Sequence, residues 1–299
     1  MRVAVTGSSG LIGTALIAAL EGDGHQVTRL VRGEAHGPNE VRWSPSAGTI
    51  DAAGLEGHAA VVHLAGVGIG DRRWTAEHKA AVLDSRVQGT SLLASTLAGL
   101  DRPPPVLATA SAVGYYGDRG AEPLTETDGP GTGFLADVVR QWEDAAAPAA
   151  AAGIRVARLR SGVVLTDKGG ALDKQLLAFK MGAGGRIGSG EQYLSWISLD
   201  DEVSAIRHVL DTATLTGPVN LTAPNPVTNA EFTKALGTVL GRPTVLPVPK
   251  FALHAMFGKE MVAEMLLAGQ RVLPAVLQAS GFAFCDVEIE AALRRILGK

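Results

Sequence analysis

A glycine-spaced motif at the start of the chain constrains the fold more than any other feature. Arg2–Thr6 read R-V-A-V-T, which predicts a short buried strand, and Gly7–Gly13 follow directly as G-S-S-G-L-I-G. The apolar pattern of Thr14–Leu20 then predicts a helix. A G-x-x-G-x-x-G turn between a strand and a helix is typical of a dinucleotide-binding unit, whereas the same glycines without that context indicate only a turn.

Each glycine of the motif has a separate expected task. Gly7 allows a sharp turn, Gly10 removes a side chain where a pyrophosphate must approach the backbone, and Gly13 lets the helix pack against the strand. The free N–H groups and the positive dipole at the start of the helix would face the phosphates. We therefore expect the cofactor to be bound by Gly7, Ser8, Ser9, Gly10, Leu11, Ile12 and Gly13.

The bulk composition excludes several classes of protein. The chain has 299 residues, 46% of them hydrophobic, which is enough for one large α/β domain or two coupled units. Aromatic residues make up only 5%, the net charge is −3 and no dense Lys/Arg block occurs, so nucleic acid is not an expected partner. The single cysteine, Cys285, cannot form an internal disulfide, and no Cys/His cluster has the spacing of a metal site.

The expected compartment is the cytoplasm. The N-terminal residues enter a strand without a basic stretch and a long apolar run, and the lone cysteine fits a reducing environment. No segment approaches ~18 uninterrupted apolar residues, so we expect no membrane span. The expected partner is a small-molecule substrate, and the chain is expected to be a monomer or a homodimer.

Strands and helices alternate along the first half of the chain. We predict strands at Val27–Val31, Ala60–Gly66, Val106–Thr109 and Arg155–Leu165, and helices at His78–Ala98 and Trp142–Ala152. This alternation predicts an α/β fold with a Rossmann-type, doubly wound parallel sheet.

The pattern changes after residue 165. Glycine-rich loops and further helices follow, while Val219–Thr222 predicts one more strand of the sheet. We expect a nucleotide-binding domain formed by residues 1–165, with returns at about 195–222. Residues 166–194 and 223–299 would form a smaller, mostly helical C-terminal domain on the substrate side. The substrate cleft should lie between the two domains, at the carboxyl ends of the strands.

The end of the second strand carries a charge that selects between cofactors. In NAD-specific sites of this kind an acidic residue follows the strand and bonds the ribose hydroxyls. Here the sequence is Leu30-Val31-Arg32, and a guanidinium suits a ribose 2′-phosphate. We therefore expect NADP(H) rather than NAD, with Val31 and Arg32 beside it. The alternative is a solvated Arg32, with Glu34 as the ribose ligand.

The third predicted strand ends in small residues. Leu64, Ala65 and Gly66 would let the adenosine and pyrophosphate pass close to the backbone, so we include them in the cofactor site. His63 precedes them inside an apolar strand. We interpret it as a packed core residue rather than a catalytic one.

The chain resembles the short-chain dehydrogenase/reductase superfamily, in an atypical form of its extended, nucleoside-sugar-epimerase-like branch. Beyond residues 7–13, the matching motifs are H-L-A-G at 63–66, S-R-V-Q-G-T at 85–90, A-S-A-V-G-Y-Y-G at 110–117, R-S-G-V-V-L at 160–165 and S-W-I-S-L-D-D at 195–201. More narrowly, it is similar to epimerase family proteins with a distinctive C-terminal domain, through R-R-W at 72–74, G-S-G-E-Q at 188–192, G-Q-R-V-L-P-A-V-L at 269–277 and G-F-A-F at 281–284.

The resemblance implies a catalytic serine followed by a Tyr-x-x-x-Lys pair on the next helix. Ser111 fits the serine position, but Leu135 and Val139 stand where the tyrosine and lysine belong. Neither aliphatic side chain can exchange a proton. Tyr115 and Tyr116 follow the serine closely, so Ser111, Tyr115 and Tyr116 are the catalytic candidates. A phenol acting near neutral pH needs a nearby cation, which Arg86 or Arg160 could supply. The alternative is that one tyrosine packs and the other shapes the pocket.

Two more residues are expected at the cofactor. Arg86 replaces the usual helix asparagine, and the resemblance places it at the cleft, against cofactor or substrate; alternatively it is a helix-surface arginine. Val163 lies where the extended family uses backbone groups against the nicotinamide amide, although it could equally be simple strand core.

These observations support two functional hypotheses. The first is an NADP-binding oxidoreductase or epimerase acting on a small polar molecule, for example a sugar- or nucleotide-linked one. The second is a non-catalytic NADPH-binding regulator or sensor, which the missing tyrosine and lysine favour. The intact cofactor motifs and the second domain favour the first.

Overall fold

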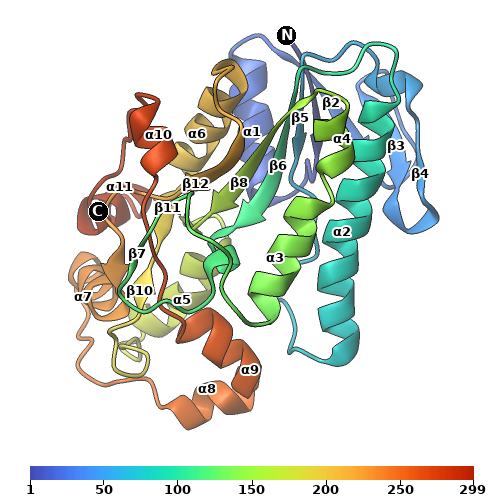
Figure 1. The fold of residues 1–299 in the computed structure, drawn as a ribbon. Coiled ribbons are helices and arrows are strands. Elements are labelled where there is room, and N and C mark those ends of the chain that lie inside the picture. The colour runs from blue at the N-terminus through green and yellow to red at the C-terminus, as the bar shows by residue number, and fades with distance from the viewer.

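An eight-stranded sheet forms the centre of the computed structural model, which describes residues 1–299 (Figure 1). Its strands are β1 (Arg2–Thr6), β2 (Gln26–Val31), β3 (Glu40–Ser44), β4 (Thr49–Ile50), β5 (Ala60–His63), β6 (Val106–Ala112), β8 (Arg155–Ser161) and β12 (Gly217–Leu221). They lie in the order β12-β8-β6-β5-β1-β2-β3-β4, and all neighbours run parallel except β3 and β4.

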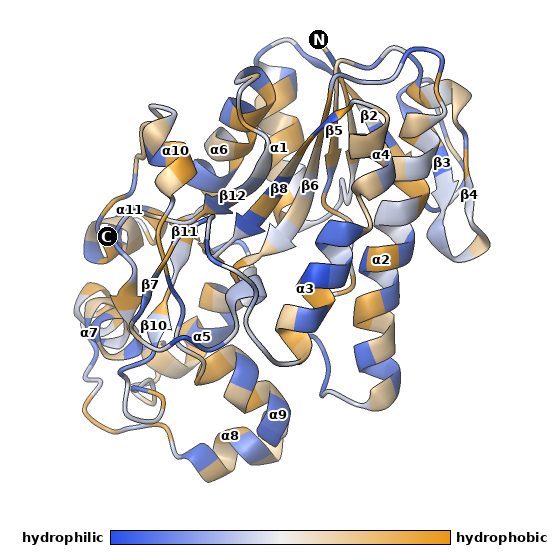
Figure 2. Ribbon diagram, viewed as in Figure 1, coloured by the Kyte–Doolittle hydropathy of each residue, from blue (hydrophilic) through white to orange (hydrophobic).

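Helices cover both faces of the sheet. On one face, α1 (Leu11–Gly22) and α6 (Leu199–Asp211) pack against the strands, and on the other lie α2 (Ala76–Ala98), α3 (Phe134–Asp144) and α4 (Ala147–Ala151). Because both faces are covered, strands such as β1 and β5 are buried apolar runs, and Figure 2 shows β5 mostly in orange. The predicted doubly wound α/β fold is therefore confirmed. No helix combines the length and apolarity that crossing a bilayer would require.

The order of the strands reverses at β1. The chain leaves β1 to form β2 and β3 on one side, then returns to form β5, β6 and β8 on the other. In open α/β sheets such a reversal opens a crevice at the carboxyl ends of the strands, where ligands bind.

The C-terminal part is mostly helical, as expected. A separate apolar cluster joins α5 (Gly170–Lys180), α7 (Asn229–Leu240) and α11 (Ile289–Ile296) to β9 (Val163–Leu165) and β11 (Trp196–Ser198). The remaining helical segments are α8 (Lys250–Phe257), α9 (Lys259–Met261), a π-helical turn (Val262–Leu266) and α10 (Ala275–Ala279). Short pairs connect β9 with β11, β10 (Tyr193–Leu194) with β13 (Val227–Thr228), and β7 (Pro123–Leu124) with β14 (Arg271–Val272).

Three local features differ from the sequence expectations. The single strand expected at Arg155–Leu165 is divided at Gly162, where a Cβ would lie 2.6 Å from the Ser195 carbonyl oxygen, so β8 stays in the main sheet and β9 pairs with β11. The helix expected at Trp142–Ala152 is two helices, α3 and α4, and α3 begins earlier, at Phe134. Strands β3 and β4 were not predicted, because their runs are short and partly exposed.

His63 ties the end of β5 to its surroundings. The Thr6 hydroxyl accepts the backbone N–H groups of Leu64 and Ala65, which leaves its own proton for His63 Nδ1 at 2.7 Å. Nε2 lies 3.0 Å from the Thr90 hydroxyl. The ring is fully buried, and burial lowers the pKa of His63 to about 4, so the imidazole is neutral at physiological pH. This environment agrees with the interpretation of His63 as a core residue.

Replacing His63 with glutamine should flatten the pH dependence of stability. In the unfolded chain a histidine takes up a proton near pH 6.5, whereas native His63 does so only near pH 4. As the pH falls from 7 to 5, this difference should remove about 2 kcal/mol from the free energy of unfolding of the unmodified chain. Denaturant titrations of His63→Gln should lack this loss, and the exposed His36→Gln should keep it. Equal pH slopes in His63→Gln and the unmodified chain would contradict the assignment.

Candidate functional site

The glycine motif and the end of β5 lie against each other at the crevice. Gly7 has φ +66°, and a Cβ there would lie 2.7 Å from the carbonyl carbon of Leu64. A Cβ on Gly13 would lie 2.2 Å from the carbonyl oxygen of Gly7. Both positions therefore require glycine for the backbone to turn and for α1 to approach β1. The loop that follows β5 is held in place by the Thr6 hydroxyl, through the N–H groups of Leu64 and Ala65.

The start of α1 is suited to an anion. Gly10 is the N-cap residue, no side chain caps the helix and no acidic residue stands in its first turn. A Cβ on Gly10 would meet only the Gly7 carbonyl oxygen, at 3.2 Å, so the side facing away from the turn is open. Ser9 and Gly10 are exposed, Ser8, Leu11 and Ile12 are half-buried, and Gly13 is buried. These free N–H groups in an open cradle fit the pyrophosphate of a dinucleotide.

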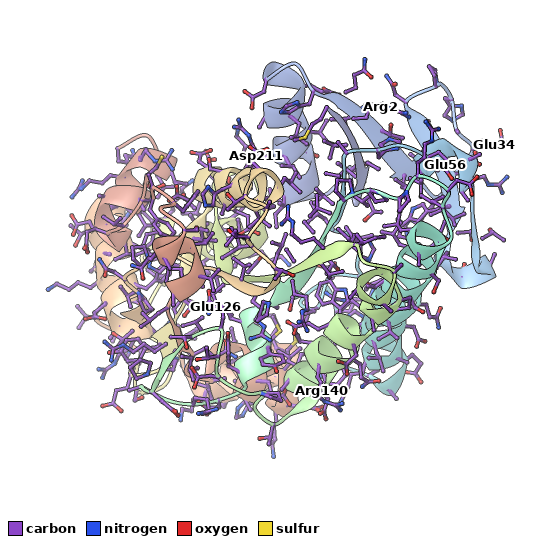
Figure 3. The ribbon with its side chains drawn as sticks, turned by 45° about the horizontal axis from the view of Figure 1, so that its top comes forward. Arg2, Glu34, Glu56, Glu126, Arg140 and Asp211 are labelled. Carbon is purple, nitrogen blue, oxygen red and sulfur yellow. The ribbon has the colours of Figure 1, made fainter.

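Arg32 follows β2 at the same edge of the sheet. Its neighbour Val31 is half-buried as the last residue of β2, whereas Arg32 is exposed and forms no ion pair or side-chain hydrogen bond. Glu34 is also exposed and lies at the outer edge of the molecule (Figure 3). An unpaired guanidinium is thus available beside the crevice.

Arg86 lies under the loop that follows β5. Its Nη1 donates to the carbonyl oxygens of Val67 (2.9 Å) and Val82 (3.1 Å), and its guanidinium stacks 4.9 Å from the Trp142 ring. A Cβ on Gly66 would lie 3.4–3.6 Å from the atoms of the Arg86 guanidinium, so the arginine packs directly against this glycine. Arg86 is therefore not the helix-surface arginine of the alternative interpretation.

Val163 begins β9 beside β11. Its N–H donates to the Ser195 carbonyl oxygen at 2.8 Å, so this N–H is already engaged within the protein. The half-buried Val163 could therefore not offer its N–H to a ligand in this arrangement.

Ser111 belongs to a buried polar network that spans three strands. Ser111, Arg160 and Asn220 are direct neighbours in register across β6, β8 and β12. Glu143 of α3 accepts the Ser111 hydroxyl proton at 2.6 Å and is held by Arg160 through Nε at 2.8 Å and Nη2 at 2.9 Å. The single proton of Ser111 is committed to the carboxylate, so toward a ligand this hydroxyl acts as an acceptor.

The two candidate tyrosines differ sharply in environment. Tyr116 is fully buried; its hydroxyl donates to Asn220 Oδ1 at 2.7 Å and accepts from Arg160 Nη1 at 2.9 Å. Burial raises the pKa of Tyr116 to about 12, against the opposing effect of Arg160. Tyr115 is half-buried, and the centroid of its ring lies 3.5 Å from the Arg160 guanidinium. Its hydroxyl forms no side-chain hydrogen bond in the protein.

The helix face that would carry the usual tyrosine and lysine is apolar. Leu135 and Val139 of α3 face the turn that carries Tyr115, since a Cβ on Gly114 would lie 3.6 Å from Leu135 and 3.9 Å from Val139. Glu264 of the π-helical turn caps this helix instead, accepting from the N–H groups of Phe134 (3.0 Å) and Leu135 (2.8 Å).

Part of this network was not predicted from the sequence. Neither Glu143 nor Asn220 was among the expected site residues, and Arg160 was named only as a possible source of positive charge. A further member, Glu126, lies in the middle of the molecule and accepts from the N–H groups of Asn220 (3.0 Å) and Val276 (3.2 Å). A usable signal existed for Asn220, which is the one polar side chain of β12 (G-P-V-N-L) and lies near its carboxyl end. Arg160 gave a weaker signal, because β8 (R-V-A-R-L-R-S) carries two more arginines.

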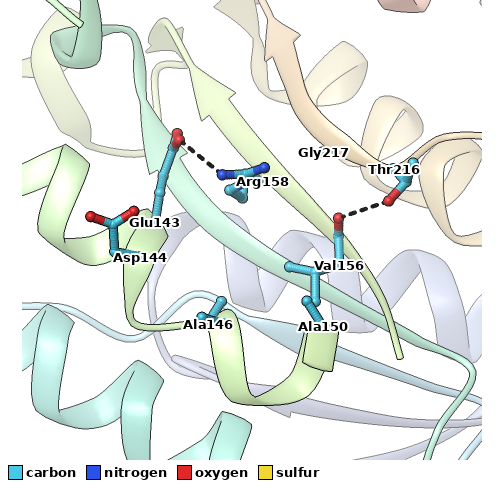
Figure 4. A pocket seen from close by; sticks show the side chains of 9 residues that line it. Glu143, Asp144, Ala146, Ala150, Val156, Arg158, Thr216 and Gly217 are labelled. Carbon is cyan, nitrogen blue, oxygen red and sulfur yellow. Dashed lines mark hydrogen bonds and ion pairs between the residues drawn. The ribbon is translucent and has the colours of Figure 1, made fainter. Parts of the chain in front are cut away.

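One pocket lies away from the predicted site. It has a volume of about 370 Å³ and is lined by Glu143, Asp144, Ala146, Ala147, Ala150, Val156, Arg158, Thr216 and Gly217 (Figure 4). Val156 and Thr216 stand at the amino-terminal ends of β8 and β12, opposite to the edge that carries the glycine motif. None of the predicted cofactor or catalytic residues lines it, so we place the site at the crevice on the geometry of the glycine turn.

The glycines allow folding and binding to be tested separately. Gly10→Val should abolish NADPH binding in calorimetry yet leave thermal unfolding cooperative, because its added side chain fills the open cradle. Gly13→Val should instead lower the melting temperature strongly, because its Cβ would overlap the Gly7 carbonyl group. Loss of cooperative unfolding in Gly10→Val as well would mean that Gly10 is structural.

Comparison with known proteins agrees with this geometry. Residues 3–221 match the NAD dependent epimerase/dehydratase family, and residues 248–296 match a domain of unknown function, DUF1731. The chain is 47% identical over 291 residues to Epimerase family protein Mb2239 of Mycobacterium bovis, covering 97% of this chain and 96% of that protein. It is 38% identical over 300 residues to human Epimerase family protein SDR39U1, covering 99% and 100%.

Solved structures extend the similarity to three dimensions. The crystal structure of human SDR39U1 (isoform 2) with NADPH has a TM-score of 0.90 at 35% identity, with full coverage of both chains. A nucleoside-diphosphate sugar epimerase from Corynebacterium glutamicum has a TM-score of 0.82 at 39% identity, where this chain is fully covered and spans 58% of the other. The chain therefore belongs to the NAD dependent epimerase/dehydratase family of extended short-chain dehydrogenases/reductases and carries a C-terminal DUF1731 domain.

Proposed function

We propose that this protein binds NADP(H) across the carboxyl ends of β1 and β5 and is an atypical short-chain dehydrogenase/reductase. It would act as an oxidoreductase or epimerase on a small polar molecule, for example one linked to a sugar or nucleotide. The observation that carries the proposal is the open, uncapped start of α1 at the point where the strand order reverses. The NADPH in the crystal structure of human SDR39U1 supports the same choice of cofactor.

The preference for NADP(H) rests on Arg32. It is an exposed guanidinium without a partner, one residue beyond β2, on the side of β1 where the adenosine half of a dinucleotide lies in this fold. A 2′-phosphate would give it a charge-assisted hydrogen bond, whereas a plain ribose would not.

The proposed chemistry uses Ser111 and Tyr115. When bound, the cofactor would supply hydride transfer to or from a carbon of the substrate. In a reduction, the free hydroxyl of Tyr115, with Arg160 against its ring, would donate its proton to the substrate oxygen as the adjacent carbon takes up the hydride. Ser111, whose proton is held by Glu143, would then accept a hydrogen bond from the substrate hydroxyl so formed. Tyr116 is proposed to hold the network together, because its hydroxyl is buried between Arg160 and Asn220.

The second candidate function is an NADPH-binding regulator. The apolar side chains of Leu135 and Val139 favour it, because the face of α3 turned toward the Tyr115 turn offers no proton-transfer group. The two functions differ in whether the redox state of bound cofactor changes when a cell metabolite extract is added.

Arg32→Ala should weaken NADPH far more than NADH. Only NADPH loses a charge-assisted contact, worth about 1.5–3 kcal/mol, or roughly 10- to 150-fold in Kd. Calorimetry on both cofactors measures this. As a control, Arg29→Ala removes an arginine of the same strand that pairs with Glu21, and it should change neither affinity. Equal NADPH and NADH affinities in the unmodified protein would contradict the proposal that Arg32 selects NADP(H).

Tyr115→Phe and Tyr116→Phe form a matched pair. With an extract that changes the absorbance of bound NADPH or NADP⁺, Tyr115→Phe should slow the change by about 10²–10⁴-fold while leaving NADPH affinity and stability nearly unchanged. Tyr116→Phe should instead lose about 1–3 kcal/mol of stability, because its buried partners lose a hydrogen bond. Undiminished turnover in Tyr115→Phe refutes this mechanism, and no absorbance change with any extract favours the regulator.

A further inference from the structure

Arg86 is a buried cation without a counter-charge. Arg86 is only 7% exposed, and no carboxylate forms an ion pair with its guanidinium. Two backbone carbonyl groups and the Trp142 ring are its only partners, and Nε has none. Burial lowers the pKa of Arg86 to about 10, so it remains charged at neutral pH. An isolated charge in such a place is costly and is retained where it serves a ligand.

The buried arginine of the neighbouring network is different. Arg160 contacts both carboxylate oxygens of Glu143, so the pair is close to neutral as a unit. Val139 of α3 contributes no charge, and Trp142, one turn later on the same helix, lies against Arg86. Of these two buried arginines, Arg86 is therefore the one without a carboxylate partner.

The topology indicates which half of the cofactor lies near this charge. A dinucleotide crosses the sheet at β1, and Arg32 on the β2 side marks its adenosine half. The nicotinamide half must then lie on the opposite side, over the ends of β5 and β6. Arg86 stands directly beneath the loop that follows β5, against Gly66 and Val67.

We propose that Arg86 makes the site distinguish the redox states of its cofactor, so that NADPH binds more tightly than NADP⁺. The oxidised nicotinamide ring carries a positive charge that the reduced ring lacks, and a nearby buried cation repels only the charged ring. This proposal rests on the proposed binding of NADP(H). A tenfold difference in affinity would raise the reduction potential of the bound cofactor by about 30 mV. The site would therefore favour hydride transfer from a substrate alcohol to the cofactor, in agreement with Ser111 as a hydrogen-bond acceptor.

Calorimetric titrations with NADPH and with NADP⁺ test the proposal. The unmodified protein should bind NADPH at least tenfold more tightly than NADP⁺. In Arg86→Met the ratio of the NADP⁺ to the NADPH dissociation constant should fall toward one, mainly because NADP⁺ binds better. Arg86→Lys keeps the charge and should keep most of this ratio of dissociation constants. Arg32→Ala, at the other half of the cofactor, should weaken both ligands equally and leave the ratio unchanged.

The possible failures can be distinguished. Equal affinities for NADPH and NADP⁺ in the unmodified protein overturn the role of Arg86 while leaving the proposed cofactor site intact, and so does an unchanged ratio in a folded Arg86→Met. If neither cofactor binds to the unmodified protein, the proposed function itself is wrong. Should Arg86→Met not fold, the ratio in the unmodified protein and in Arg86→Lys still decides the question.

Discussion

The contact between the glycine turn and the end of β5 determines where everything else in the site can lie. Gly7 and Gly13 allow α1, β1 and the loop after β5 to approach at distances that no side chain would permit. The Thr6 hydroxyl then fixes that loop by accepting two of its backbone N–H groups and by bonding to His63. Because these contacts are made within the protein, the crevice is formed before any ligand binds, and its helix start is left open.

The site combines an intact cofactor half with an altered reaction half. On the cofactor side, the start of α1 is open and uncapped, the loop after β5 packs against the glycine turn, and Arg32 stands unpaired beside them. On the reaction side, the usual helix positions hold aliphatic residues, and the charged groups come from elsewhere: Arg160 from β8 and Arg86 from α2. The ion pair of Arg160 with Glu143 orients Ser111, whereas Arg86 remains unbalanced. The two buried arginines thus have different physical roles despite their similar depth.

The sequence was sufficient for the parts that depend on local pattern. The glycine spacing, the buried strands and the doubly wound order follow from short-range rules, and they were predicted correctly. The polar network was not, because it depends on register: Arg160 meets Ser111 only through the alignment of β8 with β6, and Glu143 reaches both from a helix over thirty positions away in sequence from Ser111. Division of the strand at Gly162 was missed for a related reason, since the clash that requires glycine is with the distant residue Ser195. The different burial and hydrogen bonding of Tyr115 and Tyr116 also depend on tertiary contacts. Two adjacent tyrosines look the same in the sequence, so it could not show which one is buried.

A crystal structure of the protein with NADPH would show whether the crevice binds the cofactor in this orientation. We expect the pyrophosphate at the N-terminus of α1 over Gly10, the 2′-phosphate against Arg32, and the nicotinamide on the β5 side, between Arg86 and Tyr115. Density for NADPH in another place, such as the pocket beside Arg158, or with the nicotinamide on the β2 side, would contradict this expectation.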